Sequence, residues 1–283
     1  MPFTVLETLN WPGGGLNGSE KKVTGDDRFG FDEAAGKAWV LDGATDLGPY
    51  RLFRNEESDA AWVAEAFNRA LMAKAGETVT ELKTWFAGII ETVHTAAKKA
   101  SKHDLEKADR STWPIASGMW MQLTGDLAVF VRFGDCIALI RTPDGQTEVL
   151  EHAEQANRET ETSRKLNAMT PEEKIAGLRE IRAQQNTLPH YPVLGMRTEA
   201  VEGMSIESRT QPSGSHVLLM SDGLWRVVDV YQIMSAAEMM DTVIENGIEA
   251  LAKDMRAFER TAAQDKSVRI KASDDACGVL LRI

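Results

Sequence analysis

Cysteine is scarce in this sequence, with only Cys136 and Cys277 among 283 residues. They form no CxxC pair, so the chain is not a disulfide scaffold, and a reducing compartment such as the cytoplasm is expected. Apolar runs are short, and none approaches the roughly 20 residues that span a bilayer. The first residues lack the basic start and apolar core of a secretory signal.

Positive charge is also in short supply. Lys and Arg number 32 against 43 Asp and Glu, which leaves a net charge of −11. A chain this acidic is poorly suited to nucleic acid or to an anionic membrane, so we expect neither partner. The five histidines show no HExxH spacing, and no GxSxG motif is present. Cys136 and Arg141 are separated by one residue too few for a cysteine phosphatase, as are Cys277 and Arg282.

Apolar patterning predicts strands in clusters, without strict alternation with helices. Strands are expected at 28–31, 38–41, 119–123, 127–133, 137–141, 146–150, 205–208, 216–220 and 277–283. Helices are expected at 57–75, 79–103 and 230–263, and a polar, helix-prone stretch runs from 151 to 185. Gly-Asp and Asp-Gly dipeptides between the strands from 119 to 150 predict hairpins. This order favours an α+β fold of antiparallel sheets with helices packed outside.

Three Asp-Gly dipeptides differ in their surroundings. Asp144-Gly145 lies between two strand-like runs and is typical of a hairpin turn. Asp42-Gly43 and Asp222-Gly223 each follow a buried-looking strand without an obvious partner strand after it. Carboxylate and carbonyl oxygens on a stiff frame are how proteins hold hard cations. Either dipeptide alone is nevertheless more often a turn or a helix cap than a ligand.

Two acidic pairs strengthen the metal interpretation. Asp26-Asp27 precedes the first expected strand, and Asp274-Asp275 precedes the last one. Adjacent carboxylates repel each other and stay ionised at low cost only in water or beside a cation. A solvated loop is the plainer interpretation of each pair. Four acidic sites at strand edges could also converge in one antiparallel sandwich.

The ordered set of motifs resembles the metal-dependent (type 2C, PPM-type) protein serine/threonine phosphatases, as a divergent, bacterial-like member. That family carries an acidic pair, then Asp-Gly, Gly-Asp-Ser, Ser-Asp-Gly and finally Asp-Asn. The corresponding segments here are Asp26-Asp27, Asp42-Gly43, Gly134-Asp135-Cys136, Ser221-Asp222-Gly223 and Asp274-Asp275. The resemblance spans nearly the whole chain, and the segment from Tyr191 to Gly195 also resembles some bacterial members.

The resemblance implies a four-layer α-β-β-α sandwich, in which two antiparallel sheets are flanked by helices. It implies one phosphatase domain over residues 1–283. The polar stretch would then belong to a flap-like insertion at about 151–200, beside the active site.

The resemblance also implies roles for individual residues. Asp42 matches the carboxylate that bridges two metals, and the Gly43 carbonyl matches a ligand of the second. Asp222 and Asp274 match the other ligands of the first metal. All-oxygen ligands suit Mg²⁺ or Mn²⁺ rather than zinc.

Further roles follow at the N-terminal end. Asp26 and Asp27 match the acidic pair that holds metal-bound waters, and Lys22 stands where the family usually has a phosphate-binding arginine. The expected reaction is direct attack of a metal-bridging water on a phosphoserine or phosphothreonine monoester, with Asp42, Asp222 and Lys22 as the catalytic residues.

Some positions depart from the family pattern. Ala44 stands where many members have a histidine after Asp-Gly, and Asp275 replaces the usual asparagine. The stretch from Trp113 to Gly118 has no acid, so two metals are expected and a third is not. Ala44, Lys22 and the missing third acid keep open the alternative of a catalytically weak or inactive regulatory binding module. A metallophosphatase for small phosphorylated metabolites is a further alternative, since the sequence does not separate such a substrate from a phosphoprotein.

Overall fold

The computed structural model describes residues 2–13, 24–48, 50–53, 57–151, 165–166, 169–188, 191–261 and 273–283. The strands are β1 (Thr4–Trp11), β2 (Arg28–Asp32), β3 (Lys37–Gly43), β4 (Ala116–Thr124), β5 (Leu127–Phe133), β6 (Ile137–Arg141), β7 (Thr147–Leu150), β8 (Ser205–Thr210), β9 (His216–Met220) and β10 (Ala276–Arg282). The α-helices are α1 (Asp59–Ala73), α2 (Leu82–Ala100), α4 (Pro171–Gln185), α5 (Asp222–Trp225), α6 (Ala236–Asn246) and α7 (Ile248–Thr261). Short 3₁₀ helices lie at Leu105–Lys107, Arg110–Thr112 and Thr198–Glu202.

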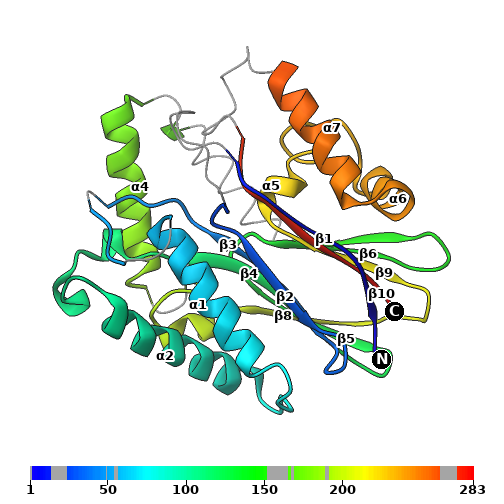
Figure 1. Ribbon diagram of the computed structural model, residues 1–283, viewed down its shortest axis with the longest axis horizontal. Helices are drawn as coiled ribbons and strands as arrows, with labels where there is room; N and C mark the ends of the chain where they lie inside the picture. The colour runs from blue at the N-terminus through cyan, green and yellow to red at the C-terminus, as the bar shows by residue number, and fades with distance from the viewer. Residues whose placement is uncertain are drawn as a thin grey trace.

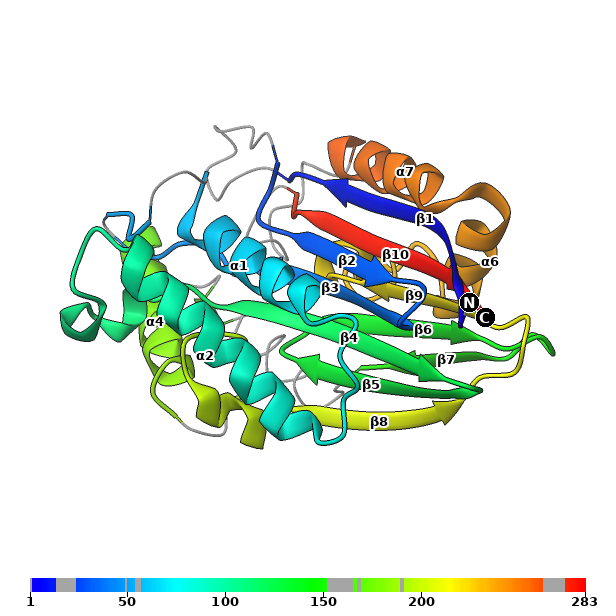
Figure 2. The same ribbon diagram turned by 60° about the horizontal axis from the view of Figure 1, so that its bottom comes forward.

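The described strands form two five-stranded antiparallel sheets. One has the order β1-β10-β9-β6-β7 and the other β2-β3-β4-β5-β8. The first and last strands pair, so the two chain ends lie together at one edge (Figure 2). Alternation along each strand sends one set of side chains between the sheets and the other toward helices.

Three apolar clusters fill the spaces between the layers. Val40, Phe130 and Met121 of one sheet meet Leu219 and Val279 of the other between the sheets. The opposite side of β3 and β4 packs against α1 and α2, and the opposite side of β9 and β10 packs against α6 and α7. Figure 1 shows these helix groups on the two outer faces. The α-β-β-α sandwich expected from the sequence is confirmed.

Local sequence explains the helices that cover the sheets. Ser58 accepts a hydrogen bond from the Ala61 N–H and so caps α1, and Thr170 forms a capping box with Glu173 at the start of α4. None of the described helices has the length and apolar character needed to cross a bilayer.

Two expectations about the elements were wrong, and one strand was not expected. Gly134-Asp135 does not close a hairpin: β5 and β6 lie in different sheets, and the dipeptide carries the chain from one to the other. The helix expected at 230–263 is two helices, because Gly247 lies between them with φ 89°. β1 was missed, since most of its side chains are only half-buried and show little apolar alternation.

The expected domain organisation is not decided by these elements. α4 falls inside the flap-like insertion proposed for about 151–200, but residues 152–164, 167–168 and 189–190 lie outside the described residues. The assignment of residues 1–283 to one phosphatase domain with that insertion stays a prediction.

Candidate active site

Two of the expected ligands meet at the end of one sheet. Asp42 is the next-to-last residue of β3 and pairs with Ser117 of β4. β2 begins directly after Asp27, and its first residue, Arg28, pairs with Leu41 of β3. Asp27 and Asp42 are the next residues along the two paired strands. The strand register therefore places the carboxylates of Asp27 and Asp42 in the same region.

The other sheet supplies its acidic residues to the same region. Asp222 follows β9 and opens α5, and Asp274-Asp275 comes just before β10. The Ser221 N–H donates to the Cys277 carbonyl (3.0 Å), and the Ser221 hydroxyl accepts from the Cys277 N–H (3.0 Å). These contacts tie the two segments together. The side chain of Asp42 lies near enough to that of Asp222 to lower its pKa, so acidic residues of the two sheets are in contact.

Burial controls the protonation of these carboxyl groups. Loss of solvent is the largest cause that raises the pKa of Asp27, Asp42 and Asp222, and the pKa of Asp222 reaches about 7. The carboxylates also act on one another: Asp275 raises the pKa of Asp27, and Asp27 raises that of Asp42. Asp135 does the same to Asp222. The group can be fully ionised at neutral pH only if positive charge joins it.

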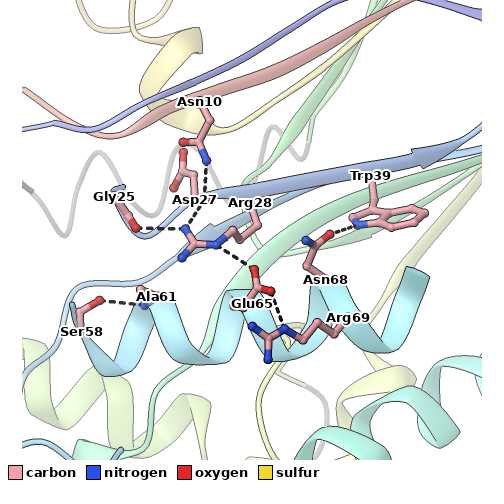
Figure 3. A network of polar contacts seen from close by, with 10 residues as sticks. All are labelled: Asn10, Gly25, Asp27, Arg28, Trp39, Ser58, Ala61, Glu65, Asn68 and Arg69. Atoms are coloured by element: carbon pink, nitrogen blue, oxygen red, sulfur yellow. Dashed lines mark hydrogen bonds and ion pairs between the residues drawn. The ribbon is translucent and has the colours of Figure 1, made fainter. Parts of the chain in front are cut away.

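Asp27 tests whether the residues present fit a divalent cation. Its backbone carbonyl is held by the side chains of Asn10 (2.9 Å) and Arg28 (2.7 Å), as Figure 3 shows. Its carboxylate is buried, and neither oxygen makes a hydrogen bond of ordinary geometry to a described residue, although the Ser221 hydroxyl is near enough to lower its pKa. Buried oxygens without donors are costly, and they suit Mg²⁺ or Mn²⁺. The residues therefore fit such an ion.

The neighbouring Asp26 is engaged by protein groups. The Ser58 hydroxyl donates to its carboxylate, and its own N–H donates to Asp275 (2.5 Å). The other oxygen of Asp275 accepts from the Gly13 N–H (2.5 Å). Asp26 is thereby fixed between the start of α1 and the segment before β10, and its role in holding metal-bound waters stays a prediction.

A closed set of metal ligands is not formed by the described residues. Among them, no three His, Cys, Asp or Glu side chains gather as a metal-binding group. Asp42 and Asp222 are in contact, whereas Asp274 acts on both through space. Metal coordination by Asp27, Asp42, Gly43, Asp222 and Asp274 accordingly stays a prediction.

The two motif glycines have a packing reason of their own. A Cβ on Gly43 would lie 2.8 Å from the backbone oxygens of Ala60 and Asp26. A Cβ on Gly223 would lie 1.8 Å from the Asp275 backbone oxygen. Both positions need glycine for close backbone approach, whether or not the Gly43 carbonyl binds a metal.

One expected catalytic residue lies outside the described part of the chain, and two residues not expected at the site lie beside its carboxylates. Lys22 lies outside the described residues, so its phosphate-binding role stays a prediction. Asp135, which the sequence assigned to a hairpin, is a half-buried member of the carboxylate group and interacts with Ser117. Arg226 forms an ion pair with Asp274 (3.3 Å). The Gly-Asp motif was an available signal for Asp135, whereas no motif pointed to Arg226.

Fold and site together define an α-β-β-α sandwich with a group of buried and half-buried carboxylates drawn from both sheets. The model of the family described as protein phosphatase 2C matches residues 19–258. The chain belongs to the protein phosphatase 2C family. A search of curated proteins finds no match to it.

Solved structures match nearly the whole chain at low identity. The S. agalactiae serine/threonine phosphatase is 15% identical with a TM-score of 0.57, covering 99% of each chain. The catalytic domain of the phosphatase PstP, in complex with two manganese ions, is 15% identical with a TM-score of 0.51, covering 98% of this chain and 96% of PstP. PppA, a regulatory component of T6SS in Pseudomonas aeruginosa, is 16% identical with a TM-score of 0.53 over 98% and 96%. These likenesses show a shared fold.

Proposed function

We propose that this protein is a Mg²⁺- or Mn²⁺-dependent phosphatase that hydrolyses phosphoserine and phosphothreonine monoesters. The observation that carries the proposal is the carboxylate group, in which neither buried carboxylate oxygen of Asp27 makes a hydrogen bond of ordinary geometry to a described residue and Asp42 contacts Asp222. Family membership supports the reaction class, and the PstP structure with two manganese ions supports the choice of metal.

Residues of this chain would each make a distinct contribution. Asp42, Asp222, Asp274 and Asp27 would hold two cations, with the Gly43 carbonyl as a further ligand. When bound, such cations lower the pKa of a water nucleophile and neutralise charge on the phosphoryl group.

Other residues would fix the site and the substrate. Asp275 and Ser58 hold Asp26 in place, and the Asn10 and Arg28 side chains hold the Asp27 backbone. Lys22 would anchor the phosphoryl group by charge, without the bidentate geometry of arginine.

A paired assay tests this proposal. The purified full chain is incubated with p-nitrophenyl phosphate and with a phosphothreonine peptide, in Mn²⁺ or in EDTA. We expect Mn²⁺-stimulated turnover that falls by at least about 100-fold in Asp42→Asn and Asp222→Asn, the order of loss when a preorganised charged group is removed. Asp144→Asn is the matched control, since this Asp-Gly lies in the exposed β6–β7 hairpin.

The results separate the proposed reaction from its alternatives. Absence of metal-stimulated turnover, or turnover unchanged in Asp42→Asn and Asp222→Asn, would rule out the phosphatase. Turnover of p-nitrophenyl phosphate but not of phosphopeptides would favour a small-metabolite substrate.

One observation favours a second candidate, a regulatory binding module. The ion pair between Arg226 and Asp274 places a fixed positive charge beside an expected metal ligand. Calorimetric Mn²⁺ binding without turnover would support this candidate over the enzyme.

A further inference from the structure

Arg226 lies at the end of the short helix that begins with Asp222. Its guanidinium donates to the Asp274 carboxylate (3.3 Å), and the two side chains are only 11% and 19% exposed. Arginine stays protonated under all ordinary conditions. A permanent cation therefore contacts one of the carboxylates assigned to metal binding.

A network of hydrogen bonds among described residues also holds this ion pair in place. The Arg226 Nε donates to the Tyr231 hydroxyl (3.2 Å), which donates to the buried carboxylate of Glu259. Arg256 donates to the other oxygen of Glu259 (2.9 Å) and to the backbone carbonyl of Asp274. Asp274 is thus held at its main chain and at its side chain, and the guanidinium is not a freely moving surface group.

The positive charge of Arg226 affects how strongly Asp274 can bind a metal ion. A carboxylate oxygen that accepts from a guanidinium is a poorer donor to a divalent cation, and the positive charge of the guanidinium repels that cation. The same positive charge stabilises the crowded carboxylates while no cation is bound.

We propose that Arg226 is a built-in counter-ion that competes with the divalent cation for Asp274, weakening metal binding at that carboxylate and stabilising the metal-free site. Arg226 is a positioning residue in this account, since it acts through Asp274. The proposal rests on the metal site of the proposed function but makes no use of turnover.

The test is calorimetric titration of Mn²⁺ into the full chain at fixed pH, with thermal unfolding in EDTA beside it. Arg226→Met should bind Mn²⁺ about tenfold more tightly than the wild type, the ratio that about 1.4 kcal/mol of lost competition gives. Its melting temperature in EDTA should fall. Arg226→Lys, which keeps the charge, should stay within about threefold of the wild-type affinity on the same scale.

Arg209→Met is the matched control. It removes the same charge from β8, where Arg209 pairs with Ala128 and its side chain bridges Glu148 and Glu207. We expect wild-type Mn²⁺ affinity in this control. Equal or weaker Mn²⁺ binding by Arg226→Met would overturn the proposal. If Arg226→Met does not fold, Tyr231→Phe releases one side of the guanidinium without a change of charge, and unchanged Mn²⁺ affinity there would overturn it equally.

Turnover, measured in parallel, keeps the two proposals apart. Tighter Mn²⁺ binding by Arg226→Met in a protein without turnover supports the role of Arg226 and rejects the phosphatase. Turnover in the wild type with unchanged affinity in Arg226→Met rejects the role of Arg226 alone. No Mn²⁺ binding by either protein rejects both.

Discussion

Asp275 departs from the asparagine usual in similar proteins, and its contacts give a reason. Its two carboxylate oxygens accept from two backbone donors, the N–H groups of Gly13 and Asp26, each at 2.5 Å. A side-chain amide offers one acceptor oxygen, and its NH₂ group would face the second N–H. The N-terminal acidic pair is therefore positioned by a carboxylate that an amide cannot replace.

Asp275→Asn tests this role through stability. The variant removes repulsion toward Asp27, but burial and neighbouring carboxylates already raise the pKa of Asp27, so little repulsion is relieved in the metal-free protein. The loss of one hydrogen-bond acceptor therefore outweighs the relieved repulsion. We expect the free energy of unfolding, measured in urea, to fall by about 1–3 kcal/mol.

Asp254→Asn, at an exposed position on α7, is the control and should change the free energy of unfolding by less than about 0.5 kcal/mol. An Asp275→Asn variant as stable as this control would show that the two hydrogen bonds contribute nothing net.

The loop after β3 is fixed by the helices on its side of the sandwich. Asp46 accepts from the backbone N–H groups of Asp59 (2.8 Å) and Ala60 (2.9 Å) at the start of α1. From α4, Arg182 donates to the Thr45 carbonyl (3.2 Å) and Arg179 donates to the Leu47 carbonyl (2.7 Å). The segment that follows Asp42-Gly43 is thus held between two helices.

Asp46→Ala should remove both the second cap of α1 and the carboxylate that Arg182 faces. We expect a loss of about 1–2 kcal/mol in the free energy of unfolding, measured in urea, because two helix-end donors lose their acceptor. Thr170→Ala, which breaks only the exposed capping box of α4, should cost less. Equal losses in the two variants would contradict a special role for the loop.

Local patterns predicted the elements whose signals are local. Helical spacing located α1 and α2, and α4 lies in the polar stretch at 151–185 that was expected to be helix-prone. The change of sheet at Gly134-Asp135 was missed because a glycine with positive φ makes the same tight turn whether the next strand joins the same sheet or the other one. β6 pairs with β7, which follows it directly, and on its other side with β9, which lies far away in the sequence.

The site residues also divide into those with a local sequence signal and those brought together from distant segments. Asp42 and Asp222 could be proposed because each ends a strand-like run, and the structure places them in contact. The ion pair of Arg226 with Asp274 joins α5 to the segment before β10, so no local pattern encodes it. The ordered motifs indicated the carboxylates of the site, but they did not indicate Arg226 as the cation beside Asp274.

Over the whole molecule, the main electrostatic feature is that an acidic chain buries part of its negative charge. The net charge is −11, and acidic side chains of both sheets come together in the buried site. Folding must therefore either protonate these carboxyl groups or pair them with cations. The stability of the protein should consequently depend on pH and metal together.

The pKa of Asp222 rises from 3.8 to about 7, mainly through burial, which sets the sign of this dependence. Well below pH 4 the group is neutral in both folded and unfolded chains. As the pH rises from there toward the folded pKa, the unfolded chain ionises first. The metal-free fold then loses about 1.4 kcal/mol of stability for every tenfold fall in proton concentration between the two pKa values.

The difference in melting temperature between wild type and Asp222→Asn should therefore depend on both pH and metal. In EDTA the two proteins should match near pH 4, and Asp222→Asn should melt higher at pH 8, because it avoids a buried charge. In saturating Mn²⁺ at pH 8 the order should reverse, since the cation stabilises only a site that keeps its carboxylate. Parallel curves in EDTA would mean that Asp222 ionises without cost in the folded protein, and that its carboxylate needs no metal to balance it.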